Sequence, residues 1–401
     1  MPDRSSRAYR ICVVGSGTRF LSGISIYTVR LANALADRHR VSIVTMRRLL
    51  PARLYPGRLR VGAQLTHLDR HPGVRISDGI DWYWGLSMIR AVTFLLRQRP
   101  DFIVLQWWTG TVLHSYLALA LLARLMRSRV IVEFHEIIET GEDRIPLARR
   151  YIGVLAPLLM RLAHAFTVHS AFDKALVRER FPSRGRPITV LPHGPHDHYK
   201  GAEGESEPIR DAPEATTNLL FFGVIRPYKG LEHLIAAFDL LEDDEIGDYW
   251  LTVVGETWEG WTLPTEMIAA SRYRERITFV NRYVHDRELD GLLAGADAVV
   301  LPYLRSSLSG PLHVAMGYGL PIIMTDVGGN AEAATGYEGI VLVAPGDALA
   351  IRDAIRRVSA MRGEEFAHPT SWAQTAEAYE ALFETLGWRG RGPLVSTIAR
   401  P

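Results

Sequence analysis

A run of small residues precedes a helical pattern near residues 310–319 and follows the apolar run AVVLP at 298–302. Small side chains let backbone N–H groups approach a ligand closely, and the dipole of a following helix favours negative charge at its N-terminus. This loop therefore predicts a binding site for a phosphate or a polyhydroxylated sugar. The predicted ligand-binding residues are Ser306, Ser307, Leu308, Ser309, Gly310 and Pro311.

Two cations lie in the segment FFGVIRPYKG at 221–230, between an apolar run and another helical pattern. Arg226 and Lys229 are placed to neutralise a diphosphate leaving group, where negative charge accumulates as a bond breaks. Lys229 is one of three lysines among 46 basic residues, so composition alone does not account for its position. The alternative is a surface pair at a strand-to-helix turn, with Arg226 in a structural salt bridge.

In their order and spacing, these two segments resemble the donor-binding domain of the retaining glycosyltransferases of family 4. The resemblance implies that Arg226 and Lys229 are catalytic, that a nucleotide-sugar is the co-substrate, and that neither a metal nor a cofactor is needed. It also places the donor base near NRYVHD at 281–286, where the family uses backbone groups. The further donor-binding residues that it implies are Gly23, Gly223, Tyr283 and Val284.

The sequence departs from this family at three positions. Members usually carry two glutamates with seven residues between them, and alignment on the Ala315–Met316 pair puts Ser306 and Val314 there. Val224 stands where an arginine usually follows the first glycine. The chain therefore either contacts the donor sugar and ribose in another way or has lost those contacts. His313 could replace one glutamate, or it could simply pack near the start of the helix.

His135 follows the predicted buried strand in VIVEFHEIIETGED, at the end of the strand where open α/β sheets bind ligands. In the resembling enzymes a histidine after this strand reaches the donor sugar and helps to shape the acceptor site, so we expect His135 to be catalytic. The neighbouring Glu133, Glu136 and Glu139 could orient it or raise its pKa. The alternative is a loop histidine bonded to one of these carboxylates.

Other histidines are interpreted as structural. His169 and His193 are expected at the edges of domains. A zinc site formed by His193, His196 and His198 is conceivable, but a linker makes a poor cage for a metal.

Short apolar runs alternate with helical patterns throughout the chain, which is typical of parallel sheets with helices on both faces. This pattern predicts an α/β protein with two Rossmann-like domains, and the family resemblance implies the GT-B architecture, in which the two domains face a central cleft. With the roles that the resemblance implies, the predicted parts are an N-terminal acceptor-binding domain at 1–195, a linker at 196–217, a C-terminal nucleotide-sugar donor-binding domain at 218–369, and a crossover helix at 370–390 that packs on the N-terminal domain.

A nicotinamide dehydrogenase is the nearest competing interpretation, because GSGTRF at 15–20 follows the first apolar run. A dinucleotide fingerprint needs a third glycine where Phe20 stands and an acidic residue where the second strand offers Thr45. Both conditions fail, so this class is excluded.

The two halves of the chain carry opposite charge. Residues 1–200 hold 30 Lys and Arg against 14 Asp and Glu, whereas residues 201–401 hold 16 against 30. This asymmetry indicates an anionic partner or membrane surface for the N-terminal half. Alternatively, the two halves attract each other across a cleft.

The segment RRLLPARLYPGRLR at 47–60 has five arginines and no acid, and the helical pattern at 146–163 adds three more arginines. Arginines interleaved with apolar residues suit an anionic membrane surface or a phosphorylated lipid acceptor. Solvated loop arginines are the alternative. We expect no nucleic-acid partner, because no motif or aromatic platform supports one.

The low cysteine content favours a protein of the reducing cytoplasm. Cys12 is the only cysteine and lies in an apolar run, so no disulfide framework is expected. No segment is predicted to cross a membrane, although peripheral association with its inner face is open. We expect a metal-independent, retaining glycosyltransferase of cell-envelope or polysaccharide synthesis. The alternatives are a catalytically silent nucleotide-sugar-binding partner of another transferase and, on the same fold, a phosphorylase or an epimerase.

Overall fold

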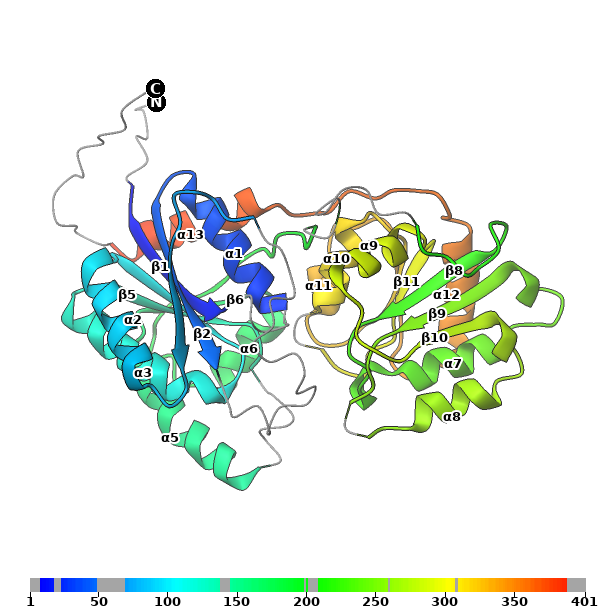
Figure 1. Cartoon of the computed structure of the whole chain (residues 1–401), viewed down its shortest axis with the longest axis horizontal. Coiled ribbons are helices and arrows are strands. Elements are labelled where there is room, and N and C mark those ends of the chain that lie inside the picture. Colours follow the sequence, from blue (N-terminus) through cyan, green and yellow to red (C-terminus); the bar gives the residue numbers. More distant parts are fainter. Residues whose placement is uncertain are drawn as a thin grey trace.

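The computed structural model describes residues 8–17, 23–48, 69–137, 145–197, 200, 208–258, 260–306 and 309–387. These residues form two parallel β-sheets, each covered by helices, and the two domains lie side by side (Figure 1). No helix in the described ranges is long and apolar enough to cross a bilayer.

The first domain is built on a sheet of seven parallel strands in the order β3-β2-β1-β4-β5-β6-β7. Its central strands are apolar almost throughout, as strands buried on both faces must be. The strands are β1 (Arg10–Ser16), β2 (Arg40–Arg48), β3 (Arg75–Asp81), β4 (Phe102–Trp107), β5 (Arg129–Phe134), β6 (Ala165–Val168) and β7 (Ile188–Val190).

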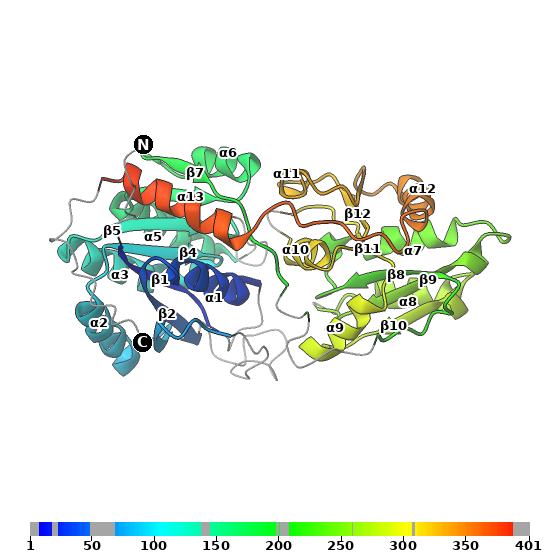
Figure 2. The same ribbon diagram turned by 90° about the horizontal axis from the view of Figure 1, so that it is seen from above.

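Helices cover both faces of this sheet (Figure 2). On one face lie α2 (Gly85–Gln98), α3 (Leu113–Leu125, after the short 3-10 turn η3 at Gly110–Val112) and α5 (Pro146–Leu162). On the other lies α1 (Gly23–Ala36), together with the last helix of the chain, α13 (Trp372–Thr385). A further helix, α6 (Ala171–Arg180), connects β6 to β7.

The second domain has six parallel strands in the order β10-β9-β8-β11-β12-β13. They are β8 (Thr217–Phe222), β9 (Tyr249–Val254), β10 (Ile277–Val280), β11 (Ala298–Leu301), β12 (Ile322–Thr325) and β13 (Ile340–Val343). One face carries α7 (Leu231–Asp239), α8 (Leu263–Ala270) and α12 (Ala348–Ser359). The other face carries α9 (Asp286–Ala294) and α10 (Gly310–Gly317), with α11 (Asn330–Ala333) nearby. The domain also contains three short 3-10 turns, η4 (Pro227–Lys229), η5 (Ile246–Asp248) and η6 (Arg274–Arg276).

The chain returns to the first domain through α13, as the family resemblance implied. Ser371 begins the helix with a capping box, in which its side chain accepts from the Gln374 backbone N–H. Tyr379 and Phe383 are fully buried with Tyr27 of α1, and the Phe383 ring lies 4.3 Å from that of Phe102. The GT-B arrangement of two Rossmann-like domains and a returning helix is confirmed.

Four elements do not follow from the apolar and helical patterns of the sequence, namely β3, α6, α8 and α11. β3 is an edge strand with polar residues and Gly79, so it lacks the apolar run of a buried strand. α6 is short and rich in charged residues, although Ser170 caps its N-terminus. The basic segment 47–60 begins in β2 with Arg47 and Arg48, and its remainder lies outside the described residues.

Candidate functional site

Both segments that carry the predicted phosphate chemistry lie at one point of the second sheet. The neighbouring strands β8 and β11 stand where the strand order reverses, which is the ligand-binding position of open α/β sheets. The segment of Arg226 and Lys229 follows β8, and the small-residue loop follows β11. A backbone hydrogen bond of 2.8 Å from Leu304 N–H to the Tyr228 carbonyl joins the two segments.

Gly230 makes this close approach possible. Its φ is 64°, and a Cβ built at this position would lie 2.0 Å from the carbonyl oxygen of Pro302. Only glycine combines the left-handed backbone with such a narrow space. The glycine that follows Lys229 therefore fixes the distance between the phosphate segment and the small-residue loop.

Lys229 is half-buried, with its Nζ 3.8 Å from the centre of the Tyr303 ring. Burial, with a contribution from the nearby Arg226, lowers the pKa of Lys229 to about 7, while Glu136 of the first domain opposes the shift. Glu136 directly follows His135, so the segment of the first domain that carries His135 lies near enough to Lys229 to act on its charge. The amine loses its charge near neutral pH unless an anion restores it.

Arg226 is held by an aromatic neighbour. Its guanidinium carbon lies 4.6 Å from the centre of the Trp258 ring. Trp258 is fixed in turn, because its Nε1–H donates to Glu256 at 2.8 Å and its backbone N–H donates to the Ile225 carbonyl at 3.0 Å. The guanidinium is therefore held over an aromatic ring, and its planar set of donors is of the kind that binds phosphate.

The small-residue loop leads into the N-terminus of α10. The buried Ser309 hydroxyl caps this helix by accepting from Leu312 N–H at 3.2 Å, and Pro311 occupies its first turn. A Cβ added to Gly310 would meet open space, and one added to Gly223 would lie 3.7 Å from Pro311. Ser306 is half-buried, whereas Ser307 and Leu308 lie outside the described residues.

The other predicted donor-binding residues lie at comparable strand ends. Tyr283 and the buried Val284 follow β10, and the Tyr283 ring lies 5.6 Å from that of His285. Gly23 is the first residue of α1, as expected for a loop-to-helix transition after β1. The role of each of these residues in donor binding stays a prediction.

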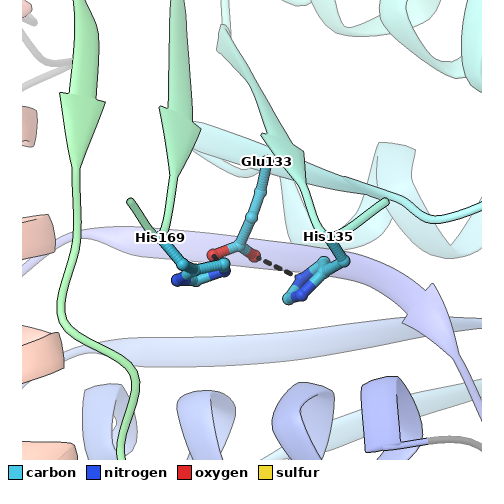
Figure 3. Close-up of side chains that lie close together, drawn as sticks. All are labelled: Glu133, His135 and His169. Carbon is cyan, nitrogen blue, oxygen red and sulfur yellow. Dashed lines mark ion pairs between the residues drawn. The ribbon is translucent and has the colours of Figure 1, made fainter. Parts of the chain in front are cut away.

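His135 lies directly after β5 and belongs to a buried group with Glu133 and His169 (Figure 3). The Nε2 atoms of His135 and His169 lie 3.4 and 3.7 Å from the two carboxylate oxygens of Glu133. Burial alone would raise the pKa of Glu133, but the two imidazoles and its hydrogen bonds lower it to about 2. A buried carboxylate thus stays charged beside the predicted catalytic histidine.

The ligand atoms of this group lie within 4.8 Å of one another, so among the described residues it could hold a metal ion. Tyr27 Oη donates to one Glu133 oxygen at 2.7 Å and Gln106 Nε2 donates to the other at 3.0 Å. These two neutral donors fix the carboxylate in place beside the imidazoles, an arrangement that is compatible both with orienting the imidazoles and with ligating a metal.

A larger histidine cluster extends from this group across the junction of the two domains. The rings of His135 and His169 are 5.0 Å apart, and His193 lies 5.3 Å from His169. His193 stacks on His313 of α10 at 3.9 Å. Two more rings complete the cluster, His196 at 4.9 Å from His193 and His368 at 5.9 Å from His313.

The sequence analysis did not foresee this cluster. His169 and His193 do lie at the edges of domains, as expected, but their neighbours come from distant segments. His313 packs against His193, which is the simpler of the two roles considered for it. Burial, followed by the neighbouring imidazoles, lowers the pKa values of His193 and His313 well below the usual value.

A second contact between the domains was also missed. Glu332 of α11 accepts hydrogen bonds from the backbone N–H groups of Ala171 at 2.5 Å and Phe172 at 2.8 Å. These groups open α6, so a carboxylate of the second domain caps a helix of the first, where the helix dipole favours negative charge. The TDVGGNAE segment gives no sign of this role, because the partner helix is formed by residues far away in sequence.

Comparisons with known proteins agree with this geometry. Residues 22–194 match the family described as glycosyl transferase 4-like domain, and residues 216–360 match the family described as glycosyl transferases group 1. The chain carries both domains of a GT-B glycosyltransferase. The predicted class of enzyme is thereby confirmed, whereas membership of retaining family 4 stays a prediction.

The relatives and solved structures are distant. The chain is 30% identical over 139 residues to the GDP-mannose:glycolipid 4-beta-D-mannosyltransferase of Xanthomonas campestris, a match that spans 35% of this chain and 38% of that enzyme. It is 27% identical over 310 residues to a Mycobacterium tuberculosis glycogen synthase, covering 72% and 69% of the two chains.

Two solved structures share the fold along nearly the whole chain. Sucrose-phosphate synthase from Thermosynechococcus elongatus has a TM-score of 0.60 at 17% identity, with 94% of each chain covered. Anabaena HepE in complex with UDP has a TM-score of 0.59 at 14% identity, with 94% of this chain and 95% of that one covered. At these identities the likeness shows the fold of this transferase alone.

Proposed function

We propose that this glycosyltransferase moves a sugar from a nucleotide diphosphate donor to an acceptor hydroxyl. The observation that carries the proposal is the placement of Lys229 and Arg226 beside the N-terminus of α10, at the strand-order reversal of the second sheet. Two cations and a helix N-terminus are suited to hold a diphosphate whose charge grows as the bond to the sugar lengthens.

The proposed mechanism needs neither a metal nor a cofactor and retains the configuration of the sugar. Lys229 and Arg226 supply the positive charge at the leaving group, and the leaving phosphate helps to deprotonate the acceptor on the same face. His135, oriented by Glu133, faces the donor sugar from the first domain. Retention rests on the family resemblance, and nuclear magnetic resonance of the anomeric centre of the product is its direct test.

The acceptor is proposed to be anionic or lipid-linked and to belong to cell-envelope or polysaccharide synthesis in the cytoplasm. Support comes from the positive charge of residues 1–200 and from the name of the Xanthomonas relative, which acts on a glycolipid. The nucleotide-sugar donor is supported by the solved complex of HepE with UDP-glucose.

A catalytically silent nucleotide-sugar-binding partner is the second candidate, because Ser306 and Val314 stand where the resembling family has glutamates. A thermal-shift panel of UDP-, GDP-, dTDP- and ADP-sugars tests donor binding. A donor at 100 times its Kd should stabilise the fold by about 2.7 kcal/mol, a shift of a few degrees.

Measuring donor turnover by the isolated protein distinguishes the two candidate functions. An active transferase releases the nucleoside diphosphate and glycosylates an acceptor, whereas a silent partner binds the donor unchanged. The absence of any stabilising donor would contradict both.

A further inference from the structure

Three of the helices on one face of the first domain have no acidic side chains. Helices α2, α3 and α5 contain no Asp or Glu, and their charged residues are arginines. They pack side by side on the same face of the sheet (Figure 1). The arginines are Arg90, Arg97, Arg124, Arg149, Arg150 and Arg161.

The same helices expose large apolar side chains to solvent. Leu86 of α2 is 69% exposed, Leu125 of α3 is 83% exposed and Leu147 of α5 is 77% exposed. Ile89, Leu96, Leu121 and Val154 on these helices are also exposed. Leucines on a protein surface are common singly, but a set spread over three adjacent helices forms a patch, which in a folded protein marks an interaction surface.

An aromatic turn borders this face. Trp82, Tyr83 and Trp84, which connect β3 to α2, are all exposed. Trp84 has φ 65°, a conformation that bulky residues rarely adopt, and its indole N–H donates to Ser115 of α3 at 3.0 Å while its ring stacks on His114. The turn is thus fixed with aromatic rings at the surface, at an energetic cost that a merely solvated loop would not need.

The turn also joins α5. His114 contacts the Tyr151 hydroxyl through Nδ1 at 2.7 Å and the Trp82 carbonyl through Nε2. Around Tyr151, the exposed Leu147 and Val154 lie one turn away on either side, with Arg150 adjacent. Aromatic, aliphatic and arginine side chains therefore form one continuous surface from the β3–α2 turn to α5.

We infer that the α2–α3–α5 face, together with the aromatic turn Trp82–Trp84, docks the enzyme on an anionic lipid bilayer. Arginines are attracted by the negative surface potential of the membrane. Aliphatic side chains insert at the boundary between headgroups and acyl chains, and Trp and Tyr prefer the level of the headgroups. A protein partner would not require every charged residue of three helices to have the same sign. The inference deepens the proposed function, because it places a lipid-linked acceptor beside this domain.

The face is also oriented for that role. The aromatic turn follows β3, and α5 begins after the segment that follows β5, so both lie toward the carboxyl edge of the sheet. This is the edge that bears His135. A bilayer in contact with the turn and the start of α5 would therefore present a lipid-linked hydroxyl close to the predicted catalytic cleft.

Vesicle co-sedimentation of the full chain tests the inference. We expect binding to vesicles of phosphatidylglycerol and phosphatidylcholine at low salt, weaker binding to phosphatidylcholine alone, and weakening by salt. Replacing arginines should weaken binding about fivefold for each charge, corresponding to about 1 kcal/mol. The arginine variants are Arg90→Gln, Arg149→Gln and Arg150→Gln, and the apolar variants, expected to cost about tenfold together, are Leu86→Ser, Ile89→Ser and Leu147→Ser.

Matched controls lie on the second domain, where Leu349 is exposed on α12 and Arg287 and Arg357 are exposed on helices. Leu349→Ser, Arg287→Gln and Arg357→Gln should leave vesicle binding unchanged, and circular dichroism melting should show that all variants fold. No binding by the parent at low salt, or equal loss in the control variants, would overturn the inference. So would a concentration-dependent dimer that the apolar variants abolish without lipid, since a second copy would then cover the face.

Donor binding is measured on the same proteins without lipid. If the parent binds donor but not vesicles, only the docking surface is wrong. If it binds vesicles but no donor, the surface stands and the proposed function is wrong.

Discussion

Lys229 is the residue in which burial, charge and chemistry act together. A lysine that is half-buried against Tyr303 and close to Arg226 holds its proton weakly, so its pKa falls to about 7. A diphosphate beside it reverses both effects, because it supplies the missing negative charge. The ammonium therefore interacts most strongly when the leaving group is most negative.

The first prediction is that Lys229 contributes more to the transition state than to donor binding. Lys229→Ala should lower kcat by about 10²–10³-fold with a smaller change in KM, the range for one preorganised electrostatic group. Arg226→Ala should act similarly, and the double variant should be non-additive because both cations face one leaving group. Steady-state kinetics measure this, with Lys174→Ala on α6 as the control. A folded Lys229→Ala protein with near-normal kcat would place the phosphate site elsewhere.

The second prediction concerns the proton itself. At pH 8 most Lys229 side chains are neutral in the free protein, so binding a diphosphate donor should take up close to one proton. Calorimetric binding enthalpies should therefore differ between buffers with different ionisation enthalpies. Lys229→Arg keeps a permanent charge, and in this variant the difference should vanish while donor binding persists. Equal enthalpies in both buffers for the parent would contradict a titrating Lys229.

At the scale of elements, α10 is the helix whose start faces the proposed donor. Its N-terminus depends on the hydroxyl of Ser309, because Pro311 donates no backbone hydrogen bond and Gly310 has no side chain. The third prediction is that Ser309→Ala lowers the unfolding free energy by about 1 kcal/mol and weakens donor binding by about two- to fivefold.

A matched control lies on α13. Ser371 caps that helix in the same way on the first domain, so Ser371→Ala should cost similar stability in chemical denaturation without changing the donor Kd. Equal donor affinity in the parent and Ser309→Ala would show that the start of α10 does not touch the donor.

The succession of elements could be predicted from sequence because buried parallel strands are apolar on both faces. The apolar runs NLLFFG at 218–223 and AVVLP at 298–302 form β8 and β11, respectively. The two loops that follow these strands meet where the strand order reverses. β3 could not be found in this way, since an edge strand with Asp78 and Gly79 lacks that pattern. Nor could the stacking of Arg226 on Trp258, because it depends on the pairing of β8 with β9.

At the scale of the whole molecule, the junction of the domains was beyond sequence reasoning. Its six histidines come from strand ends of the first domain, from both segments that connect the domains, and from α10. Single histidines carry no pattern, and only the folded chain brings them together. The bond of Glu332 to the start of α6 is equally remote in sequence. These contacts join the two domains that carry the predicted site residues.

The fourth prediction follows from the burial of these imidazoles in their neutral form. Burial and the neighbouring histidines lower the pKa of His169 to about 4, and those of His193 and His313 fall well below 6.5. Above pH 6.5 the stability is complete, because neither the folded nor the unfolded chain holds these protons. As the pH falls from 6.5 toward 4, the unfolded chain takes up protons that the folded one excludes, so stability is lost.

By pH 5 this loss should reach about 2 kcal/mol for His169, and the lowered pKa values of His193 and His313 add to it. His193 and His313 stack directly on each other across the domain junction, so charging them places two like charges in contact, and we expect this contact to separate first. Urea unfolding between pH 7.5 and 5 measures the slope, and small-angle scattering measures the separation of the domains. His313→Asn removes one ring whose pKa burial lowers, and it should reduce the slope by up to one proton. Stability that stays flat down to pH 5 would show that these histidines are not excluded from protonation at the junction.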